Sequence, residues 1–382
     1  AHLVRRPSTR AADGGGMTRA PASVGQRVEE VDTPALVLDL DAFEANLATL
    51  AASTRDRVRV RPHAKTHKCP EIAKRQLALG AVGVCCQKVT EAEALIDGGI
   101  TDVLVSNEVV GAPKIARLAE LAKRAHLGVC VDNPQNVAAL EASGAKLDVY
   151  IELEVGMRRC GIAPGAPAVS LAKEIVRSKN LRFAGLQAYH GRAQHMRTTE
   201  ERHAAIEAAA QHVFETKRLL EKAAIPCPIV TGAGSGTYML EVEAGAWDEI
   251  QVGSYIFMDA DYARNEWAAP LPRFQHSLFV LASVMSLPAA DRAIVDAGLK
   301  ASSVDSGMPV VWQREGLTYS RASDEHGVLD IASAARMPAL GEKLFLVPGH
   351  CDPTVNLYDW YVCVRRGRVE ALWPITARGA LN

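Results

Sequence analysis

Short apolar runs alternate with longer segments of helical periodicity through the first two thirds of the chain. Short apolar runs between polar clusters are typical of buried strands, whereas apolar residues three or four positions apart are typical of amphipathic helices. The runs that predict strands lie at 58–61, 82–86, 102–105, 127–131, 147–155, 183–188, 229–230 and 250–252. The segments that predict helices include 71–79, 115–123, 168–176 and 200–223. This alternation predicts parallel β–α units.

Eight β–α units within about 200 residues favour an α/β fold of the (β/α)8 TIM barrel type. A doubly wound open sheet is the alternative. That fold normally carries a GxGxxG turn after its first strand, and the sequence has no such turn there. The barrel is therefore the preferred interpretation.

After residue 276 the chain changes to runs rich in β-branched and aromatic residues with short turns. This pattern predicts a C-terminal all-β domain over 276–382, behind a barrel over 36–275. The segment 17–35 is expected to pair with the β domain. Residues 1–16 are polar and end in three glycines, so they are expected to be either a tail added for expression or a natural disordered arm.

Composition narrows the function classes. The 382 residues include 43 Lys and Arg against 44 Asp and Glu, so no charge excess favours nucleic acid or an anionic membrane as a partner. No apolar run is long enough to predict a membrane span. The eight cysteines form no CxxC pair, and several lie inside apolar runs, which favours a reduced cytoplasmic interior.

Polar residues follow nearly every predicted strand, at the end where TIM barrels carry their chemistry. Lys65 follows the first strand, where a desolvated lysine can lose its charge and attack a carbonyl group. Lys68, Lys88 and Lys300 are weaker alternatives, because most lysines are solvated surface charges. The other strand-end residues are Gln87, Ser106, Asn107, Asp132, Asn133, Arg159, Tyr189, His190 and His195.

Two glycine-rich turns follow the seventh and eighth strands, at 231–237 (TGAGSGT) and 253–255 (GSY). Converging backbone N–H groups and hydroxyls suit a phosphate dianion. The alternative is a pair of tight turns that need positive φ. A phosphate site together with Lys65 indicates pyridoxal 5′-phosphate, held covalently by the lysine.

A second motif is PGHCDPT at 348–354. Residues two apart on an extended segment share a face, so His350 and Asp352 are predicted to bind one ion, such as Mn or Mg. Cys351 in place of Asp352 would favour zinc, and a His–Asp hydrogen bond in a turn is the alternative. His195 can accept a proton, and Arg159 can bind a carboxylate or a pyridine nitrogen.

These segments together resemble the fold type III pyridoxal-phosphate family that holds D-threonine aldolase, 3-hydroxy-D-aspartate aldolase and D-serine dehydratase, with an alanine racemase-like barrel. The resemblance runs from residue 32 to the C-terminus. One departure is TGAGSG, where TGGGTG is more common. The matching segments are DTPALVLDLDAFEANL, RPHAKTHKCPEIA, GVCCQKVTEAEA, VSNEVV, GMRRCGI, GLQAYHGRAQH, QVGSYIFMDADY, VDAGLK, SDEHG and PGHCDPTVN.

The resemblance implies that Lys65 forms the Schiff base and that His350 and Asp352 hold the metal. Dehydratase members are similar but carry His-x-Cys, so Asp352 places this chain with the aldolases. The residues expected to bind the cofactor are Lys65, Gln87, Arg159, Tyr189, Thr231, Ser235, Gly236, Thr237, Gly253, Ser254 and Tyr255.

The implied activity is retro-aldol cleavage of D-3-hydroxy amino acids (D-threonine, D-allo-threonine or phenylserine) to glycine and an aldehyde. The metal would bind the β-hydroxyl, and His195 would take its proton. The alternatives are 3-hydroxy-D-aspartate cleavage, dehydration on the same scaffold, racemisation, or a pyridoxal-phosphate carrier without turnover. A homodimer is expected, with one subunit's β domain closing the other's barrel.

Overall fold

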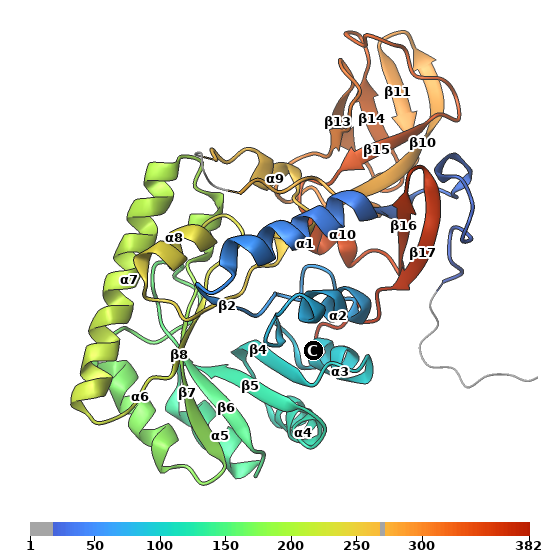
Figure 1. Ribbon diagram of the computed structural model, residues 1–382. Coiled ribbons are helices and arrows are strands. Elements are labelled where there is room, and N and C mark those ends of the chain that lie inside the picture. The colour runs from blue at the N-terminus through green and yellow to red at the C-terminus, as the bar shows by residue number, and fades with distance from the viewer. Residues whose placement is uncertain (1–17, 268–271) are drawn as a thin grey trace, which may run out of the picture.

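The computed structural model describes residues 18–267 and 272–382, so the expectation for residues 1–16 lies outside the described part. These residues form two sheets, which Figure 1 shows side by side. Within the described residues, no helix has the length and apolar character needed to cross a membrane.

The first sheet is an eight-stranded parallel barrel in the order β2-β9-β8-β7-β6-β5-β4-β3. Its strands are β2 (Arg59–Val60), β3 (Val84–Cys86), β4 (Asp102–Glu108), β5 (His126–Val131), β6 (Leu147–Glu152), β7 (Leu181–Ala188), β8 (Ile229–Gly232) and β9 (Glu249–Ile250). Two backbone hydrogen bonds between the segments of β2 and β3 close the barrel. The Val82 N–H donates to the Val60 carbonyl, and the Cys85 N–H donates to the Pro62 carbonyl, both at 2.9 Å. The predicted barrel fold is confirmed.

Helices surround this barrel (Figure 1). They are α1 (Leu40–Thr54), α2 (Pro70–Ala78), α3 (Val89–Asp97), α4 (Ala112–Leu121), α5 (Pro134–Ala142), α6 (Ala166–Arg177), α7 (Thr199–Lys222) and α8 (Tyr238–Ala244). Four of them, α2, α4, α5 and α6, have proline in the first turn, where a missing N–H costs nothing. In α7, Thr198 and Glu201 cap each other's backbone N–H groups.

The inside of the barrel is packed with side chains. Its apolar part contains Cys85, Leu104, Cys130, Tyr150 and Ala184. All eight cysteines are free, and six are buried, as expected of small apolar side chains. The barrel is therefore a packed core, and only its mouth is open to ligands.

The second sheet contains nine strands and includes the first strand of the chain. Its strands are β1 (Ala35–Asp39), β10 (Leu278–Ala289), β11 (Arg292–Val295), β12 (Val310–Val311), β13 (Thr318–Ala322), β14 (Gly327–Asp330), β15 (Lys343–Val347), β16 (Trp360–Arg365) and β17 (Arg368–Pro374). Strand β1 pairs antiparallel with β10 and parallel with β16. The backbone N–H of Gly25 also donates to Val369 (2.8 Å), so residues before β1 contact this sheet before the chain enters the barrel through α1.

Four short helical elements lie between the sheets or at the barrel mouth, and a fifth precedes β1. They are η2 (Gly191–His195), η3 (Ser254–Ile256), α9 (Ala260–Ala263), α10 (Cys351–Val355) and the early η1 (Val28–Glu30). Figure 1 shows α9 and α10 where the second sheet meets the barrel. These elements carry several of the predicted site residues.

Candidate active site

A cavity of about 180 Å³ opens at the carboxyl ends of the barrel strands, and residues of the barrel, together with His350 and Asp352 at the start of α10, line it. Ten of the predicted site residues lie on its wall: Lys65, Gln87, Arg159, Tyr189, His195, Ser235, Gly253, Ser254, His350 and Asp352. The structure therefore brings the predicted lysine, glycine-rich turns and metal pair into one cavity.

Lys65 lies in a tight turn directly after β2. The backbone N–H of Ala64 donates to Cys85 in the neighbouring strand (2.7 Å), and Lys68 adopts φ +53° to close the turn. Burial acts to lower the pKa of Lys65, but the Tyr189 phenol and the Asp352 carboxylate outweigh it and raise the pKa above its ordinary value. In the protein without its cofactor, these two groups favour the charged form of Lys65 over the neutral form that burial alone would favour.

His63, Gln87 and Ser106 form a polar group beside Lys65. His63 Nε2 lies 3.0 Å from Gln87 Nε2 and 3.3 Å from Ser106 Oγ. Burial, together with the Lys65 charge, lowers the pKa of His63 well below its ordinary value, so its ring is neutral. A neutral ring fits a position close to a cationic lysine.

The two glycine-rich turns approach other groups so closely that an added Cβ would displace a neighbouring side chain. A Cβ on Gly253 would lie 2.4 Å from Thr66 Oγ1, and one on Gly234 would lie 2.5 Å from Gln194 Oε1. The positive φ that the alternative interpretation required occurs earlier, at Gly232 (158°) and Ala233 (67°). Space, rather than backbone conformation, requires glycine at 234 and 253.

Thr66 lies at the end of the cavity that the two glycine-rich turns approach. Its side chain is fully buried, and its Oγ1 has no hydrogen-bond partner among the residues that the structure describes. Ser235 lies nearby on the wall, and its hydroxyl accepts from the Tyr255 N–H (2.9 Å). A buried hydroxyl without a partner costs free energy, which a phosphate oxygen would recover.

Three predicted cofactor residues make hydrogen bonds within the protein and do not line the cavity. Thr231 Oγ1 donates to Glu249 Oε1 (3.0 Å). The Gly236 N–H donates to Gln194 Oε1 (2.9 Å), and Thr237 Oγ1 accepts from Gln194 Nε2 (2.7 Å). Gln194, which the sequence did not single out, therefore holds the turn in shape from behind.

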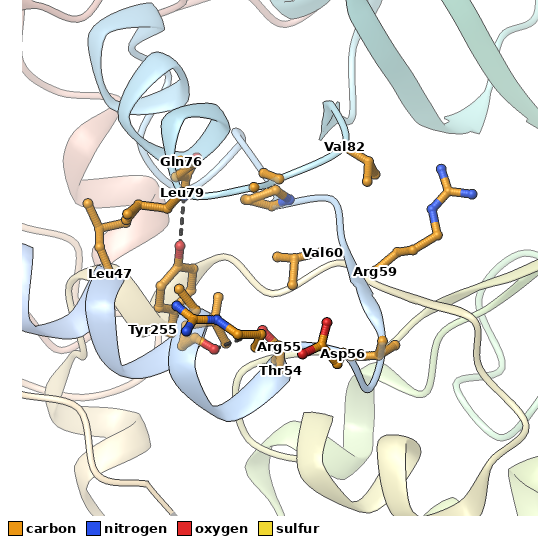
Figure 2. Close-up of a pocket in the computed structure, with 16 residues that line it drawn as sticks. Leu47, Thr54, Arg55, Asp56, Arg59, Val60, Gln76, Leu79, Val82 and Tyr255 are labelled. Atoms are coloured by element: carbon orange, nitrogen blue, oxygen red, sulfur yellow. Dashed lines mark hydrogen bonds between the residues drawn. The ribbon is translucent and has the colours of Figure 1, made fainter.

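Tyr255 also points away from the cavity. Figure 2 shows its ring in a separate cleft of about 410 Å³, where its hydroxyl meets Gln76 Nε2 at 3.1 Å. Residues of α1 and α2 line this outer cleft. Only the backbone N–H of Tyr255 is directed toward the cavity, through Ser235.

Arg159 faces the cavity from the loop after β6. Its Cζ lies 5.8 Å from the centroid of the Tyr189 ring, and its Nη2 lies 3.7 Å from Glu152 Oε1. Burial and the neighbouring Glu108 raise the pKa of Glu152 to about 8, so Glu152 is protonated at neutral pH. Arg159 therefore keeps positive charge that a ligand in the cavity can use.

His195 ends η2 and is held by a carboxylate. Its Nδ1 lies 2.5 Å from Asp261 Oδ2, and Arg197 donates to the same carboxylate (2.6 Å). Burial acts to raise the pKa of Asp261, but hydrogen bonds from Arg197, His195 and Arg264 lower it to about 2. A fixed anion on Nδ1 leaves Nε2 as the nitrogen that can exchange a proton.

His350 and Asp352 both line the cavity, but not for the predicted reason. Strand β15 ends at Val347, and His350 is the N-cap of α10, so the pair lies at a helix start and not on an extended segment. His350 Nδ1 lies 2.7 Å from Asp305 Oδ2. Asp352 Oδ1 is buried without a hydrogen-bond partner in the described part of the chain.

This donor set fits a hard divalent cation. An unpartnered carboxylate oxygen and an imidazole whose Nδ1 is already bound are typical of an oxygen-rich metal site. Within residues 18–267 and 272–382, no group of three or more His, Cys, Asp or Glu side chains could hold an ion. Two protein ligands would therefore leave the other positions to water or substrate.

Several lining residues were missed by the sequence analysis: His63, Thr66, Gln187, Gln251 and Tyr262. Gln187 lies within the otherwise largely apolar strand β7, and Gln251 directly follows β9. Their amides hydrogen-bond to each other (2.7 Å). A polar residue in or beside a buried strand is a signal that could have found both.

Comparison with known families gives two matches along the chain. The model described as "Alanine racemase, N-terminal domain" matches residues 38–261. The model described as "Putative serine dehydratase domain" matches residues 277–364. The first corresponds to the barrel and the second to much of the C-terminal sheet.

Two relatives are similar over nearly their whole length. D-threonine aldolase from Arthrobacter sp is 50% identical over 364 residues, which cover 94% of this chain and 96% of the relative. 3-hydroxy-D-aspartate aldolase from Paracoccus denitrificans (strain Pd 1222) is 46% identical over 370 residues, 94% of this chain and 95% of the relative.

Two solved structures are also similar. The crystal structure of D-threonine aldolase from Filomicrobium marinum has a TM-score of 0.93 and 50% identity, and covers 96% of this chain and 100% of that one. A variant of D-threo-3-hydroxyaspartate dehydratase, described as a metal-free form, has a TM-score of 0.81 and 27% identity over 91% of this chain and 98% of its own.

Proposed function

We propose that this chain, which belongs to the D-threonine aldolase / 3-hydroxy-D-aspartate aldolase family, cleaves D-3-hydroxy amino acids to glycine and an aldehyde. It is a D-threonine aldolase-like enzyme, an aldehyde-lyase. The alanine racemase-like barrel implies pyridoxal 5′-phosphate as the cofactor. The observation that carries the proposal is one cavity that contains Lys65, residues of the two glycine-rich turns, and the unpartnered Asp352 oxygen.

Residues on the cavity wall would hold the cofactor. Lys65 would bind its aldehyde carbon, while Arg159 and Tyr189 would contact its ring. Thr66 and Ser235, with the N–H groups of the turns at 234 and 253, would bind its phosphate. When bound, pyridoxal phosphate supplies a ring that accepts the electron pair of the breaking Cα–Cβ bond.

His350 and Asp352 would hold a divalent metal, with Mn or Mg as the best candidates for a site of this hardness. A metal there supplies a Lewis acid for the β-hydroxyl of the substrate. Asp305 keeps His350 oriented through Nδ1, which leaves the other ring nitrogen for the ion. A structure described as the metal-free form of a related dehydratase variant supports metal dependence in relatives of this fold.

His195 would take the proton of the β-hydroxyl as the Cα–Cβ bond breaks, because Asp261 orients its ring through Nδ1. The hydroxyl carbon then becomes the aldehyde carbon. A proton delivered to Cα completes glycine. Every atom of the substrate is therefore accounted for in the two products.

Cleavage of 3-hydroxy-D-aspartate is a second candidate, favoured by the relative that is 46% identical. It needs the same groups and differs only in the substituent on the β-carbon. The aldehyde released would then be glyoxylate. The homodimer expected from the resemblance stays a prediction, and light scattering of the purified protein tests it.

The deciding experiment uses EDTA-treated holoenzyme with D-threonine, D-phenylserine and D-3-hydroxyaspartate. Mn, Mg and Zn are added back separately, and L-threonine serves as the control. Glycine and aldehyde in equal amounts, restored by Mn or Mg, are the expected result. Ammonia with a keto acid would instead identify a dehydratase, and full activity after EDTA would remove the metal from the proposal.

A further inference from the structure

The turn at residues 259–264, which contains α9, connects the part of the site that holds His195 with the part that holds His350. Two residues of this turn, Asp259 and Arg264, have no role in the proposed reaction. We propose that Asp259 and Arg264 are positioning residues that set the distance between His195 and the His350–Asp352 pair. This inference rests on the proposed function, because it assigns the two sides of that site to the proton acceptor and the metal.

Asp259 caps two helices from different parts of the chain. Its side chain is fully buried. Oδ1 accepts from the Tyr262 N–H (3.0 Å) and caps α9, and Oδ2 accepts from the N–H of Cys351 (3.1 Å), the first residue of α10. The Ala260 N–H also donates to the Pro348 carbonyl (2.9 Å), so the two helix starts are joined side by side.

Each of these helices carries one side of the proposed site. On α9, Asp261 holds His195 Nδ1, and the Tyr262 ring lies 5.6 Å from the His195 ring. On α10, Asp352 lies one residue beyond Cys351, and His350 is the N-cap. A single carboxylate therefore fixes the start of both helices relative to each other.

Arg264 makes a second link between the two sides. One nitrogen, Nη2, donates both to an oxygen of Asp261 and to the Ser306 carbonyl (2.8 Å). Ser306 follows Asp305, whose carboxylate lies 2.7 Å from His350 Nδ1. The chain of contacts runs from His195 through Asp261, Arg264 and the loop at 303–307 to His350.

The 303–307 loop packs directly against the segment that carries His350. A Cβ on Gly349 would lie 2.0 Å from the Gly307 carbonyl oxygen, so the two backbones are in contact. The Ser303 N–H donates to Thr354 Oγ1 (3.1 Å), and that hydroxyl donates to the His350 carbonyl (2.8 Å). Losing the Arg264 contact would therefore loosen the loop and the imidazole that it orients.

The expected consequence is a loss of reaction rate and of metal affinity rather than of folding. The proton acceptor and the metal must meet at one hydroxyl, and small errors in such a geometry lower rates strongly. Groups that orient metal ligands typically change metal affinity by 10- to 100-fold when they are lost. A purely structural role for Arg264 would change the melting temperature and leave both quantities unaltered.

The test compares R264Q and R264K with R124Q in the cofactor-loaded enzyme. Arg124 is a matched control, because its side chain is 51% exposed against 54% for Arg264, and it forms an ion pair with Asp97 (2.7 Å) away from the cavity. The dissociation constant of Mn is measured from the electron paramagnetic resonance of free Mn, and kcat and KM are measured for D-threonine at saturating Mn.

R264Q is expected to weaken Mn binding and to lower kcat, each by about tenfold, while R124Q leaves both unchanged. R264K is expected to recover most of the loss, since both contacts of Arg264 use one nitrogen and an ammonium group can donate to two acceptors. Wild-type Mn affinity and kcat in R264Q would overturn the inference, as would an R264K that is no better than R264Q.

D259N is the second variant. Its amide can accept from only one of the two N–H groups and would turn its own NH₂ toward the other, so a larger fall in kcat than in R264Q is expected. If D259N does not fold, the Arg264 series decides. Failure of the proposed function is seen separately in H350A: wild-type Mn affinity in H350A would place the metal elsewhere, and the kcat of R264Q against R124Q would still decide the inference.

Discussion

At the amino ends of the barrel strands His126 lies between two carboxylates, whereas at the carboxyl ends His350 is held by one. His126 Nδ1 lies 2.9 Å from Asp102, and Nε2 lies 2.9 Å from Asp148. Among the described residues, His350 has only its Nδ1 engaged, by Asp305 at 2.7 Å. The same residue type is therefore saturated at one end of the barrel and left with a free nitrogen at the other.

Other polar groups at the two ends differ in the same way. At the amino end Arg61 donates to Asp102 and to the buried Glu249 (2.9 Å). At the carboxyl end Thr66 Oγ1 and Asp352 Oδ1 are buried without a partner among the described residues. A buried polar atom without a partner costs about 1–3 kcal/mol. Glu249 Oε2 at the amino end is also buried without a partner in the described part of the chain. The carboxyl end differs because its two unpartnered atoms belong to residues on the cavity wall, where a ligand would recover the cost.

The largest effect that would test this contrast is expected at Lys65. Lys65→Ala removes the covalent attachment of the cofactor, and activity should fall on the order of 10⁴-fold, as for other residues that carry the chemistry. The visible absorbance of the lysine-bound cofactor should disappear in the same variant. Lys300→Ala is the control, because Lys300 pairs with Glu325 on the surface. An active, coloured Lys65→Ala enzyme would place the cofactor elsewhere.

The next test compares the removal of His350 with the removal of His126. His350→Ala should lower aldol cleavage on the order of 10³-fold, since a metal at a reacting oxygen contributes several kcal/mol, and cofactor absorbance should remain. His126→Ala should leave cleavage unchanged and lower the melting temperature. Aldehyde release and thermal unfolding are measured for both. If both variants lost activity alike, the two ends would not differ in the way proposed.

The barrel and Lys65 could be predicted because both depend on local pattern. Alternating apolar runs and amphipathic segments define β–α units, and the carboxyl end of each strand follows from the direction of the chain. Lys65 needs only the end of β2 to be located. The glycine-rich turns at 231–237 and 253–255 were found for the same reason, since each directly follows a barrel strand.

What could not be predicted depends on contacts between distant segments. The helix at His350–Asp352 starts where it does because Asp259, far earlier in the chain, accepts from the Cys351 N–H. The pKa of Lys65 is raised by Tyr189, which follows β7 of the barrel, and by Asp352 on α10, far along the chain. Tyr255 turns outward because Gln76 on α2 meets its hydroxyl. No local pattern contains these partners.

A smaller effect is expected from the phosphate end, where Thr66→Val is compared with Tyr255→Phe. The first removes the unpartnered hydroxyl inside the cavity, and the second removes a hydroxyl in the outer cleft (Figure 2). Thr66→Val should weaken pyridoxal phosphate binding by about 1 kcal/mol, or roughly fivefold.

Binding of pyridoxal, which lacks the phosphate, should be unchanged in Thr66→Val. Tyr255→Phe should bind both compounds as the wild type does. Fluorescence titration of the cofactor-free protein measures each affinity. A Tyr255→Phe variant that bound pyridoxal phosphate more weakly would return Tyr255 to the phosphate site predicted from the sequence.

The smallest effect is expected at His126, at the amino ends of the barrel strands, and concerns how the free energy of unfolding depends on pH. Burial acts to lower the pKa of His126, but its hydrogen bonds to Asp102 and Asp148 outweigh burial and raise the pKa above 6.5. A raised pKa in the folded state means that the stabilisation is complete below the unfolded value and is lost as pH rises through the folded value.

His126→Asn should therefore lower the free energy of unfolding more at pH 6 than at pH 9. The difference should stay below about 1 kcal/mol, since the ring is half exposed and water screens its charge. Urea unfolding at both pH values measures it, with His203→Asn as the control, because His203 is paired with one carboxylate at 4.0 Å on the surface of α7. An equal loss at the two pH values would mean that His126 is not held as a cation, and the contrast between the barrel ends would then rest on the unpartnered atoms alone.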